Sequence, residues 1–167
     1  MNKVKSLKRK DLLGLKDLSL EELELLFDTA DGMKEIFSRP IRRVPALVGK
    51  SIFTLFYEAS TRTRNSFDMA AKMLSAGVTH VATSLSSVQK GETLIDTAKN
   101  IEALGADAII IRHSFAGSPH LLAENLKIPV INAGDGFNEH PTQGLLDIFT
   151  MREKKGPLKG KKVLIVG

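Results

Sequence analysis

Cysteine is absent from this chain of 167 residues, so the protein can form neither a disulfide framework nor a thiolate metal site. Histidine is sparse, and the four that occur lack the spacing of metal ligands: His80, His113, His120 and His140. We therefore expect no metal and no other cofactor. The sequence also lacks an apolar run long enough to cross a membrane and the apolar stretch of a signal peptide. We expect a globular, soluble, cytoplasmic protein with no membrane partner.

Acidic residues are outnumbered, and the formal net charge is +5 with a pI near 9.5. The excess of lysine and arginine lies in residues 3–10 and 152–162. No aromatic residue alternates with these cations and no nucleic-acid-reading motif is present, so we expect solvated segments and no nucleic-acid partner. A positive field also favours an anionic small substrate.

Short β-branched runs alternate with longer helical stretches after residue 50. This alternation predicts an α/β fold, a three-layer arrangement in which a parallel sheet is flanked by helices. The predicted strands are 51–57, 78–84, 107–112, 128–132 and 162–166. The last of them follows a polar link and is expected to begin a second domain, which predicts a natural chain of about 300 residues.

Helix signals lie before and between these strands. Ser19 and Glu22 have capping-box spacing and predict a helix to about Phe37 that covers the sheet. The next helix is expected to end near Gly77, and another is expected over residues 92–104.

Polar residues cluster where three of the predicted strands end. They are Ser60-Thr61-Arg62-Thr63-Arg64, Arg112-His113 and the segment NAGDGFNEHPTQ, residues 132–143. The carboxyl ends of parallel strands lie at one edge of a sheet, and α/β folds bind their ligands there. These clusters are therefore predicted to line a single crevice.

The segment Ser60–Thr63 begins a helix, and the unpaired N–H groups of a helix start carry partial positive charge. Together with the hydroxyls and the guanidinium of Arg62, they can hold a tetrahedral anion such as phosphate. The alternative is that one of the hydroxyls only caps the helix and that the arginines pair with Glu58 or with solvent. A second arginine at the same crevice, Arg112, favours the phosphate site.

Pro141 at the first position of the next helix places His140 in extended backbone, with Gln143 one turn into the helix. Both side chains are expected to face the crevice, where a neutral His140 can donate a hydrogen bond to a carbonyl. His140 can alternatively serve only as a helix cap. The segment SSVQKGET, residues 86–93, has the composition of a surface loop with one lysine, Lys90.

Four segments together resemble the catalytic chain of the aspartate branch of the aspartate/ornithine carbamoyltransferase family: FYEASTRTRNSF, SSVQKGETLIDT, AIIIRH and NAGDGFNEHPTQGLLDIFT. The resemblance extends from about residue 12 to the last residue. The first segment is similar to carbamoyltransferases in general. The other three segments resemble the aspartate branch, because ornithine enzymes typically lack the KGET loop, the RH strand end and the NAGDG sequence.

The resemblance implies that carbamoyl phosphate and L-aspartate are converted to N-carbamoyl-L-aspartate and phosphate, for pyrimidine synthesis, without a covalent enzyme intermediate. It assigns the phosphate to Ser60, Thr61, Arg62 and Thr63, the carbonyl oxygen to Arg112 and His140, and the carbamoyl amide to Gln143. Members of the family are homotrimers with shared active sites, to which the neighbouring subunit contributes the equivalents of Ser86 and Lys90.

The resemblance also implies a carbamoyl-phosphate-binding domain over residues 1–139, an interdomain helix over 140–156 and the truncated start of an aspartate-binding domain over 157–167. Most aspartate-binding residues of the family lie in that second domain, so this chain alone is expected to be inactive or weakly active. Two alternatives remain, an ornithine or other carbamoyltransferase and a non-catalytic anion-binding or trimerisation module. The protein can further associate with a regulatory chain, with dihydroorotase or with neither, and the sequence leaves these three possibilities open.

Overall fold

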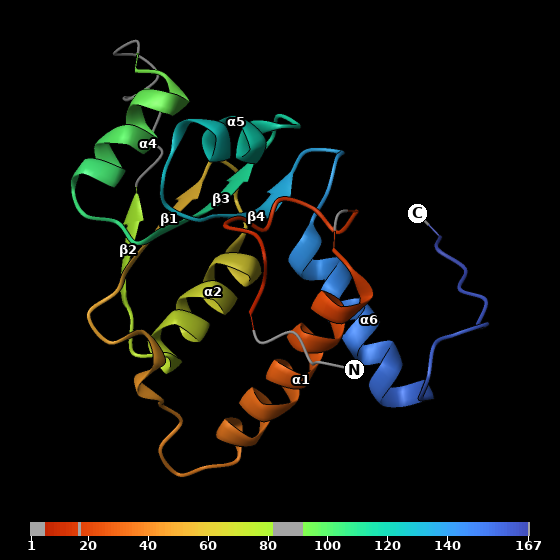
Figure 1. Ribbon diagram of the computed structural model, residues 1–167. Helices are drawn as coiled ribbons and strands as arrows, with labels where there is room; N and C mark the ends of the chain where they lie inside the picture. Colours follow the sequence, from red (N-terminus) through yellow and green to blue (C-terminus); the bar gives the residue numbers. More distant parts are fainter. Residues whose placement is uncertain (1–5, 17, 82–91, 167) are drawn as a thin grey trace.

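The computed structural model describes residues 6–16, 18–81 and 92–166. Within them, a parallel four-stranded sheet has the strand order β2-β1-β3-β4 (Figure 1). The strands are β1 (Ser51–Phe56), β2 (Gly77–Val81), β3 (Ala108–His113) and β4 (Val130–Asp135). The predicted α/β class, a parallel sheet flanked by helices, is confirmed.

Helices cover both faces of this sheet. They are α2 (Thr61–Met73), α4 (Leu94–Ala103), α5 (Ser118–Asn125) and α6 (Pro141–Lys155). A further helix, α1 (Leu20–Phe37), packs beside α6, and a short 3-10 helix spans Pro45–Leu47. In Figure 1, α4 and α5 lie on one side of the sheet, and α2 and α6 lie on the other. None of the described helices has the length and apolar character needed to cross a membrane.

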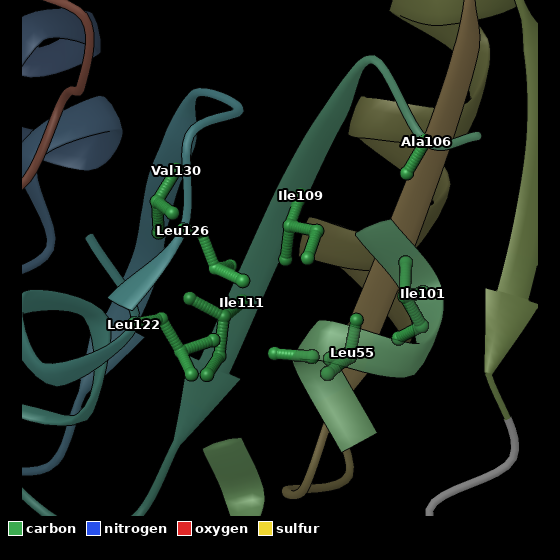
Figure 2. Close-up of a cluster of buried hydrophobic side chains, with 9 residues drawn as sticks. Leu55, Ile101, Ala106, Ile109, Ile111, Leu122, Leu126 and Val130 are labelled. Carbon is green, nitrogen blue, oxygen red and sulfur yellow. The ribbon is translucent and has the colours of Figure 1, made fainter. Parts of the chain in front are cut away.

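The larger core cluster fills the space between the sheet and the layer of α4 and α5 (Figure 2). Because side chains alternate along a strand, Ile109 and Ile111 of β3 share this face with Leu55 of β1. Leu122 of α5 and Ile101 of α4 pack against them, and all five side chains are at most 4% exposed. Burying a side chain of this size contributes about 1.5–3 kcal/mol, so this layer holds the helices on the sheet.

The opposite face of the sheet carries the smaller core cluster, in which Ala108 and Ile110 of β3 meet Ala71 of α2. The alternation continues to the end of β3, so Arg112 belongs to the face of α2 and His113 belongs to the face of α4 and α5. The pattern of the strand therefore directs Arg112 to the side of the sheet where α2 begins.

The N-terminal segment runs beside β4 as a further edge of the sheet. Leu12 forms a parallel bridge with Ile131. Its N–H donates to the carbonyl of Val130 at 3.0 Å, and its carbonyl accepts from the N–H of Asn132 at 2.8 Å. Asp11 Oδ1 accepts from the N–H of Val130 at 2.8 Å. The segment thus covers hydrogen-bonding groups that an edge strand would otherwise expose.

The capping box predicted at the start of α1 is present. Ser19 Oγ accepts from the N–H of Glu22 at 3.2 Å, and Glu22 Oε2 accepts from the N–H of Ser19 at 3.1 Å. A hydrogen bond from Arg9 lowers the pKa of the buried Glu22 to about 2. The expectation that α1 covers the sheet is wrong, because neither core cluster contains one of its residues. Phe27 of α1 instead contacts Phe149 of α6, with ring centroids 5.8 Å apart.

Residues 162–166 do not form a strand, which corrects the sequence prediction. The apolar side chains of this segment are exposed, with values of 59% for Val163 and 90% for Ile165. A strand requires a hydrogen-bonded neighbour, and no strand of the described residues pairs with this segment. Its β-branched composition alone is therefore insufficient to make a strand.

The turn between α2 and β2 also differs from the prediction. Gly77 is the first residue of β2 rather than the end of the helix. The chain leaves the helix through Ser75, whose φ is +67°, and Ser75 Oγ donates to the carbonyl of Val44 at 2.9 Å. A serine thus occupies the left-handed position for which the sequence suggested glycine. The last residues of the predicted strand 78–84 lie outside the described residues.

The strand predicted over 128–132 begins and ends later. Glu102 Oε1 accepts from the N–H groups of Lys127 and Ile128 at 2.7 and 3.2 Å, so these groups do not join the sheet. The strand continues through Asn132 to Asp135, both fully buried. The predicted strand ended at Asn132, but the buried side chains of Asn132 and Asp135 find hydrogen-bonding partners inside the fold, and the strand continues to Asp135.

Lys10 closes the carboxyl end of α5, where its Nζ donates to the carbonyls of Ala123, Leu126 and Ile128 at 3.2, 2.7 and 3.3 Å. We expect Lys10→Ala to lower the free energy of unfolding by about 1–2 kcal/mol, because these carbonyls lose a cationic donor. Urea unfolding followed by circular dichroism measures the change. The control is Lys127→Ala, at an exposed lysine, with an expected change below about 0.5 kcal/mol. Equal effects would contradict the capping role.

Candidate functional site

The strand order reverses between β1 and β3. The next strand after β1, β2, lies on one side of it, and β3 and β4 follow on the other side. The helices that follow β1 and β3 lie on opposite faces, so a crevice opens between the carboxyl ends of these two strands. A pocket of about 950 Å³ lies there. It is lined by Ala59, Ser60, Thr61, Arg62, Thr63, Ser66, Phe67, Ala70, Arg112, His140, Thr142, Gln143 and Leu146.

The candidate residues that the structure describes come together at this pocket from separate elements. Ser60, Thr61, Arg62 and Thr63 stand at the start of α2, Arg112 at the end of β3, and His140 and Gln143 at the start of α6. Ser86 and Lys90 lie outside the described residues. His113 is not among the lining residues, since its ring lies on the other face of the sheet beside those of Tyr57 and Phe115.

The amino end of α2 presents hydrogen-bond donors to the pocket. Ser60 occupies the N-cap position, but its side chain makes no capping hydrogen bond. The first N–H groups of the helix have no acceptor within it, and no acidic residue lies in this first turn. The positive end of the helix dipole and the guanidinium of Arg62 therefore act on the same space. This geometry does not fit the interpretation of Ser60 as only a cap.

Arg112 is held against the pocket wall by two hydrogen bonds. Its Nε donates to Glu58 Oε2 at 3.1 Å, and its Nη1 donates to the carbonyl of Ala133 at 3.2 Å. Glu58, considered above as a partner for the arginines at the start of α2, bonds to Arg112 instead. Because a guanidinium has more donors than these two bonds use, Arg112 is oriented and still able to bind a ligand.

Gly134 makes room for the two side chains that meet at the back of the pocket. Its φ is +119°, a conformation that favours glycine. A Cβ at this position would lie 3.0 Å from Arg112 Nη1 and 3.3 Å from His140 Cδ2. Arg112 and His140 can therefore pack closely against the backbone only because this residue has no side chain.

His140 precedes α6 at the N-cap position, and its side chain makes no capping hydrogen bond. Its Nδ1 lies 3.3 Å from Thr142 Oγ1. Burial lowers the pKa of His140, and the charge of Arg112 lowers it further. The imidazole is therefore neutral at pH 7 and can offer a hydrogen bond without adding a charge.

Gln143 lies on the first turn of α6, where its Nε2 donates to Asp147 Oδ1 at 3.0 Å. This bond orients the amide and leaves its carbonyl oxygen as an acceptor for an N–H donor. Within the described ranges, no three acidic or histidine side chains gather as metal ligands would. The pocket instead combines cations, hydroxyls and N–H groups, a set that suits a tetrahedral anion joined to a carbonyl.

The hydrogen bond from Arg112 to Glu58 was not predicted from the sequence, and Gly134 and Thr142 were predicted only as parts of the polar segment 132–143. Glu58 follows β1 by two residues, and β1 pairs with β3 so that Phe56 is opposite Arg112. Only the strand order reveals that contact. Gly134 could have been noticed because the segment NAGDG places two glycines beside the predicted site.

The fold is that of an α/β domain with a pocket of cations and N–H donors at the switch point of its parallel sheet. Residues 10–153 match the family model described as aspartate/ornithine carbamoyltransferase, carbamoyl-P binding domain. The chain belongs to the aspartate/ornithine carbamoyltransferase family. The resemblance inferred from its motifs is thereby confirmed.

Similar proteins of known name point to the aspartate branch of the family. The aspartate carbamoyltransferase catalytic subunit of Acetivibrio thermocellus is 62% identical over 161 residues, which are 96% of this chain and 52% of that protein. The catalytic subunit of Moorella thermoacetica is 60% identical, with the same coverage of 96% and 52%. This chain therefore spans about half the length of the curated relatives it matches.

Solved structures of named aspartate transcarbamoylases share the fold. The Trypanosoma cruzi enzyme in complex with carbamoyl phosphate and aspartate gives a TM-score of 0.84 at 30% identity, covering 90% of this chain and 46% of that one. The catalytic subunit of M. Jannaschii aspartate transcarbamoylase gives 0.81 at 43% identity, covering 91% and 49%.

We expect Gly134→Ala to weaken the binding of carbamoyl phosphate by about tenfold, equivalent to about 1.4 kcal/mol, because a Cβ there would displace Arg112 and His140. Titration calorimetry measures the change. Gly105→Ala is a matched control, since Gly105 also has a positive φ, +91°, but a Cβ there would meet nothing within 4 Å. Equal losses in both variants would show that backbone strain, not displacement of the two side chains, causes the effect.

Proposed function

We propose that this chain is the carbamoyl-phosphate-binding half of an aspartate carbamoyltransferase, which transfers the carbamoyl group of carbamoyl phosphate to the amine of L-aspartate. The observation that carries the proposal is the meeting of the α2 amino end, Arg112 and His140 around one pocket. The similarity to aspartate carbamoyltransferase catalytic subunits supports the choice of acceptor. The product, N-carbamoyl-L-aspartate, fits a role in pyrimidine synthesis in the cytoplasm.

The phosphate group is assigned to Ser60–Thr63, where hydroxyls, N–H groups and Arg62 can surround its oxygens. The carbonyl oxygen is assigned to Arg112 and His140. Gln143 lines the same pocket and can accept a hydrogen bond from the carbamoyl amide. Each group of the substrate thus meets a side chain of matching hydrogen-bonding character.

In the proposed reaction, the aspartate amine attacks the carbonyl carbon and forms the new C–N bond. The C–O bond to phosphate breaks, phosphate leaves with the electron pair, and the leaving phosphate accepts the proton that the amine loses. Negative charge grows on the carbonyl oxygen and on the leaving phosphate, so fixed donors near Arg112 and Arg62 stabilise the transition state more than the substrate. The protein needs no nucleophile of its own for this transfer.

The proposed domain division follows the family. Residues 1–139 form the carbamoyl-phosphate-binding domain, 140–156 the interdomain helix, and 157–167 the start of an aspartate-binding domain. We place most contacts to L-aspartate in that second domain. We also propose a homotrimer in which Ser86 and Lys90 complete the phosphate site of a neighbouring subunit. An association with a regulatory chain or with dihydroorotase would add to this trimer without changing the pocket.

We expect Arg62→Ala and Arg112→Ala each to lower kcat of the full-length enzyme by about 10²–10³-fold, because each removes a donor from developing negative charge. Production of carbamoyl aspartate at saturating substrates measures kcat. Arg64→Ala is the matched control, as Arg64 belongs to the same helix start but does not line the pocket. Near-normal turnover of either test variant would refute the assignment. Transfer to ornithine rather than aspartate would move the protein to the other branch.

Shared sites predict complementation between inactive subunits. Mixing Lys90→Ala subunits with Arg62→Ala subunits should restore activity, because some sites in the hybrid trimers then contain neither substitution. Carbamoyl aspartate formation before and after subunit exchange measures the restoration. Unmixed variants taken through the same exchange are the controls. A mixture no more active than its components would contradict a site built from two subunits.

A further inference from the structure

Asp135 is a fully buried carboxylate at the end of β4, outside the residues that line the pocket. Its Oδ1 accepts from Asn132 Nδ2 at 3.0 Å and from the N–H of Glu139 at 3.0 Å. Its Oδ2 accepts from the N–H of Gly117 at 2.8 Å and from Asn138 Nδ2 at 3.0 Å. Both oxygens are thus satisfied by donors from three places in the fold: β4, the turn before α6, and the start of α5.

These hydrogen bonds keep the carboxylate charged although it is buried. Burial alone would raise the pKa of Asp135, but the bonds from Asn132, Gly117, Asn138 and Glu139 outweigh it, and the pKa is lowered. All four partners are hydrogen-bond donors. An amide at position 135 would turn its own NH2 group toward some of them, and two donors cannot form a hydrogen bond. The arrangement therefore depends on a carboxylate rather than on any polar side chain of this size.

The chain on either side of Asp135 carries two parts of the pocket. Gly134 precedes it and gives Arg112 and His140 their space. After it, the turn closes when the N–H of Asp135 donates to the carbonyl of Glu139 at 3.1 Å, and His140 is the next residue. Movement of this carboxylate would therefore displace Gly134 and His140 together.

The same turn is fixed to the loop that follows β3. The N–H of Gly136 donates to the carbonyl of His113 at 2.9 Å. A Cβ on Gly136, whose φ is +60°, would lie 2.4 Å from the carbonyl oxygen of Ser114. With Asp135 bonded to Gly117, the loops after β3 and β4 form one unit behind the pocket.

We propose that Asp135 is a positioning residue for the candidate active site: its carboxylate fixes the turn that holds Gly134 and His140, and through them the guanidinium of Arg112. The inference deepens the proposed function, on which it rests for its effect on turnover. The amino end of α2 belongs to a separate element and receives no hydrogen bond from Asp135. Loss of the carboxylate should therefore impair the carbonyl side of the pocket while the phosphate side is preserved.

The test uses Asp135→Asn in the full-length protein with three measurements. We expect the pKa of the His140 imidazole, followed by NMR in the ligand-free protein, to rise toward its ordinary value as the turn loosens and water reaches the ring. Inorganic phosphate should bind within about threefold of the normal affinity, since the start of α2 is unchanged. The kcat for carbamoyl transfer should fall by about 100-fold, the scale expected for a displaced catalytic group.

Asp107→Asn is the matched control. Asp107 also accepts a backbone N–H, that of Ser51 at 2.8 Å, and bonds to Lys50 Nζ at 2.8 Å, but it precedes β3 at the opposite edge of the sheet. This variant should lose thermal stability and keep the normal His140 titration and kcat. If both aspartate variants behave alike, or if Asp135→Asn leaves His140 and kcat unchanged, the positioning role is refuted.

Asn138→Ala provides a milder second variant in case Asp135→Asn does not fold. It removes one donor to Asp135 Oδ2 and should shift the His140 titration in the same direction by a smaller amount. An unchanged titration in this folded variant would also refute the proposal. Failure of the unmodified protein to transfer carbamoyl groups would overturn the proposed function alone, because the ligand-free NMR measurement tests the positioning role independently.

Discussion

The reversal of strand order between β1 and β3 is the constraint from which the pocket follows. Parallel pairing of these strands places their carboxyl ends at one edge, while their following helices depart to opposite faces. The amino end of α2 then stands across the crevice from Arg112, the next-to-last residue of β3, whose side chain is on the α2 face of the sheet. A different strand order would leave the same residues in the sequence without bringing them to a common space.

Charge at the pocket is divided between permanent cations and neutral donors. Arg62 and Arg112 bring guanidinium cations to the pocket, whereas burial and the charge of Arg112 lower the pKa of His140 and hold its imidazole neutral. Glu58 offsets part of the charge of Arg112 and fixes its direction. The arginine charges therefore attract an anion from a fixed direction. The donors on the carbonyl side of the pocket are effective because they are held in position.

Much of this arrangement was predictable from sequence because it depends on local rules. The capping box at Ser19, the proline after His140 and the apolar run of β1 each act within a few residues. The contacts that orient the side chains of the pocket join residues that are distant in sequence. Glu58 and Arg112 are far apart in sequence, and their hydrogen bond follows from β1 pairing with β3. Patterning in a single chain carries no direct record of which strands are neighbours.

The errors of prediction have physical causes of the same kind. Asp135 lies beyond the predicted strand, yet it finishes a buried strand because its carboxylate accepts from the side chain of Asn132 and from nearby backbone. Residues 162–166 have the opposite property, a strand-forming composition without a neighbour to pair with. In both cases the outcome depends on hydrogen-bonding partners, which local propensity does not specify.

The exposed apolar run Val163–Val166 also affects how this chain behaves at high concentration. Leu164 and Val166 are each 86% exposed, and unpaired β-branched segments of this kind can add to one another as strands. The neighbouring Lys161 and Lys162 act as gatekeepers, since their like charges oppose side-by-side stacking of identical chains. Salt screens that repulsion, so raising the ionic strength of a concentrated sample favours self-association through this segment.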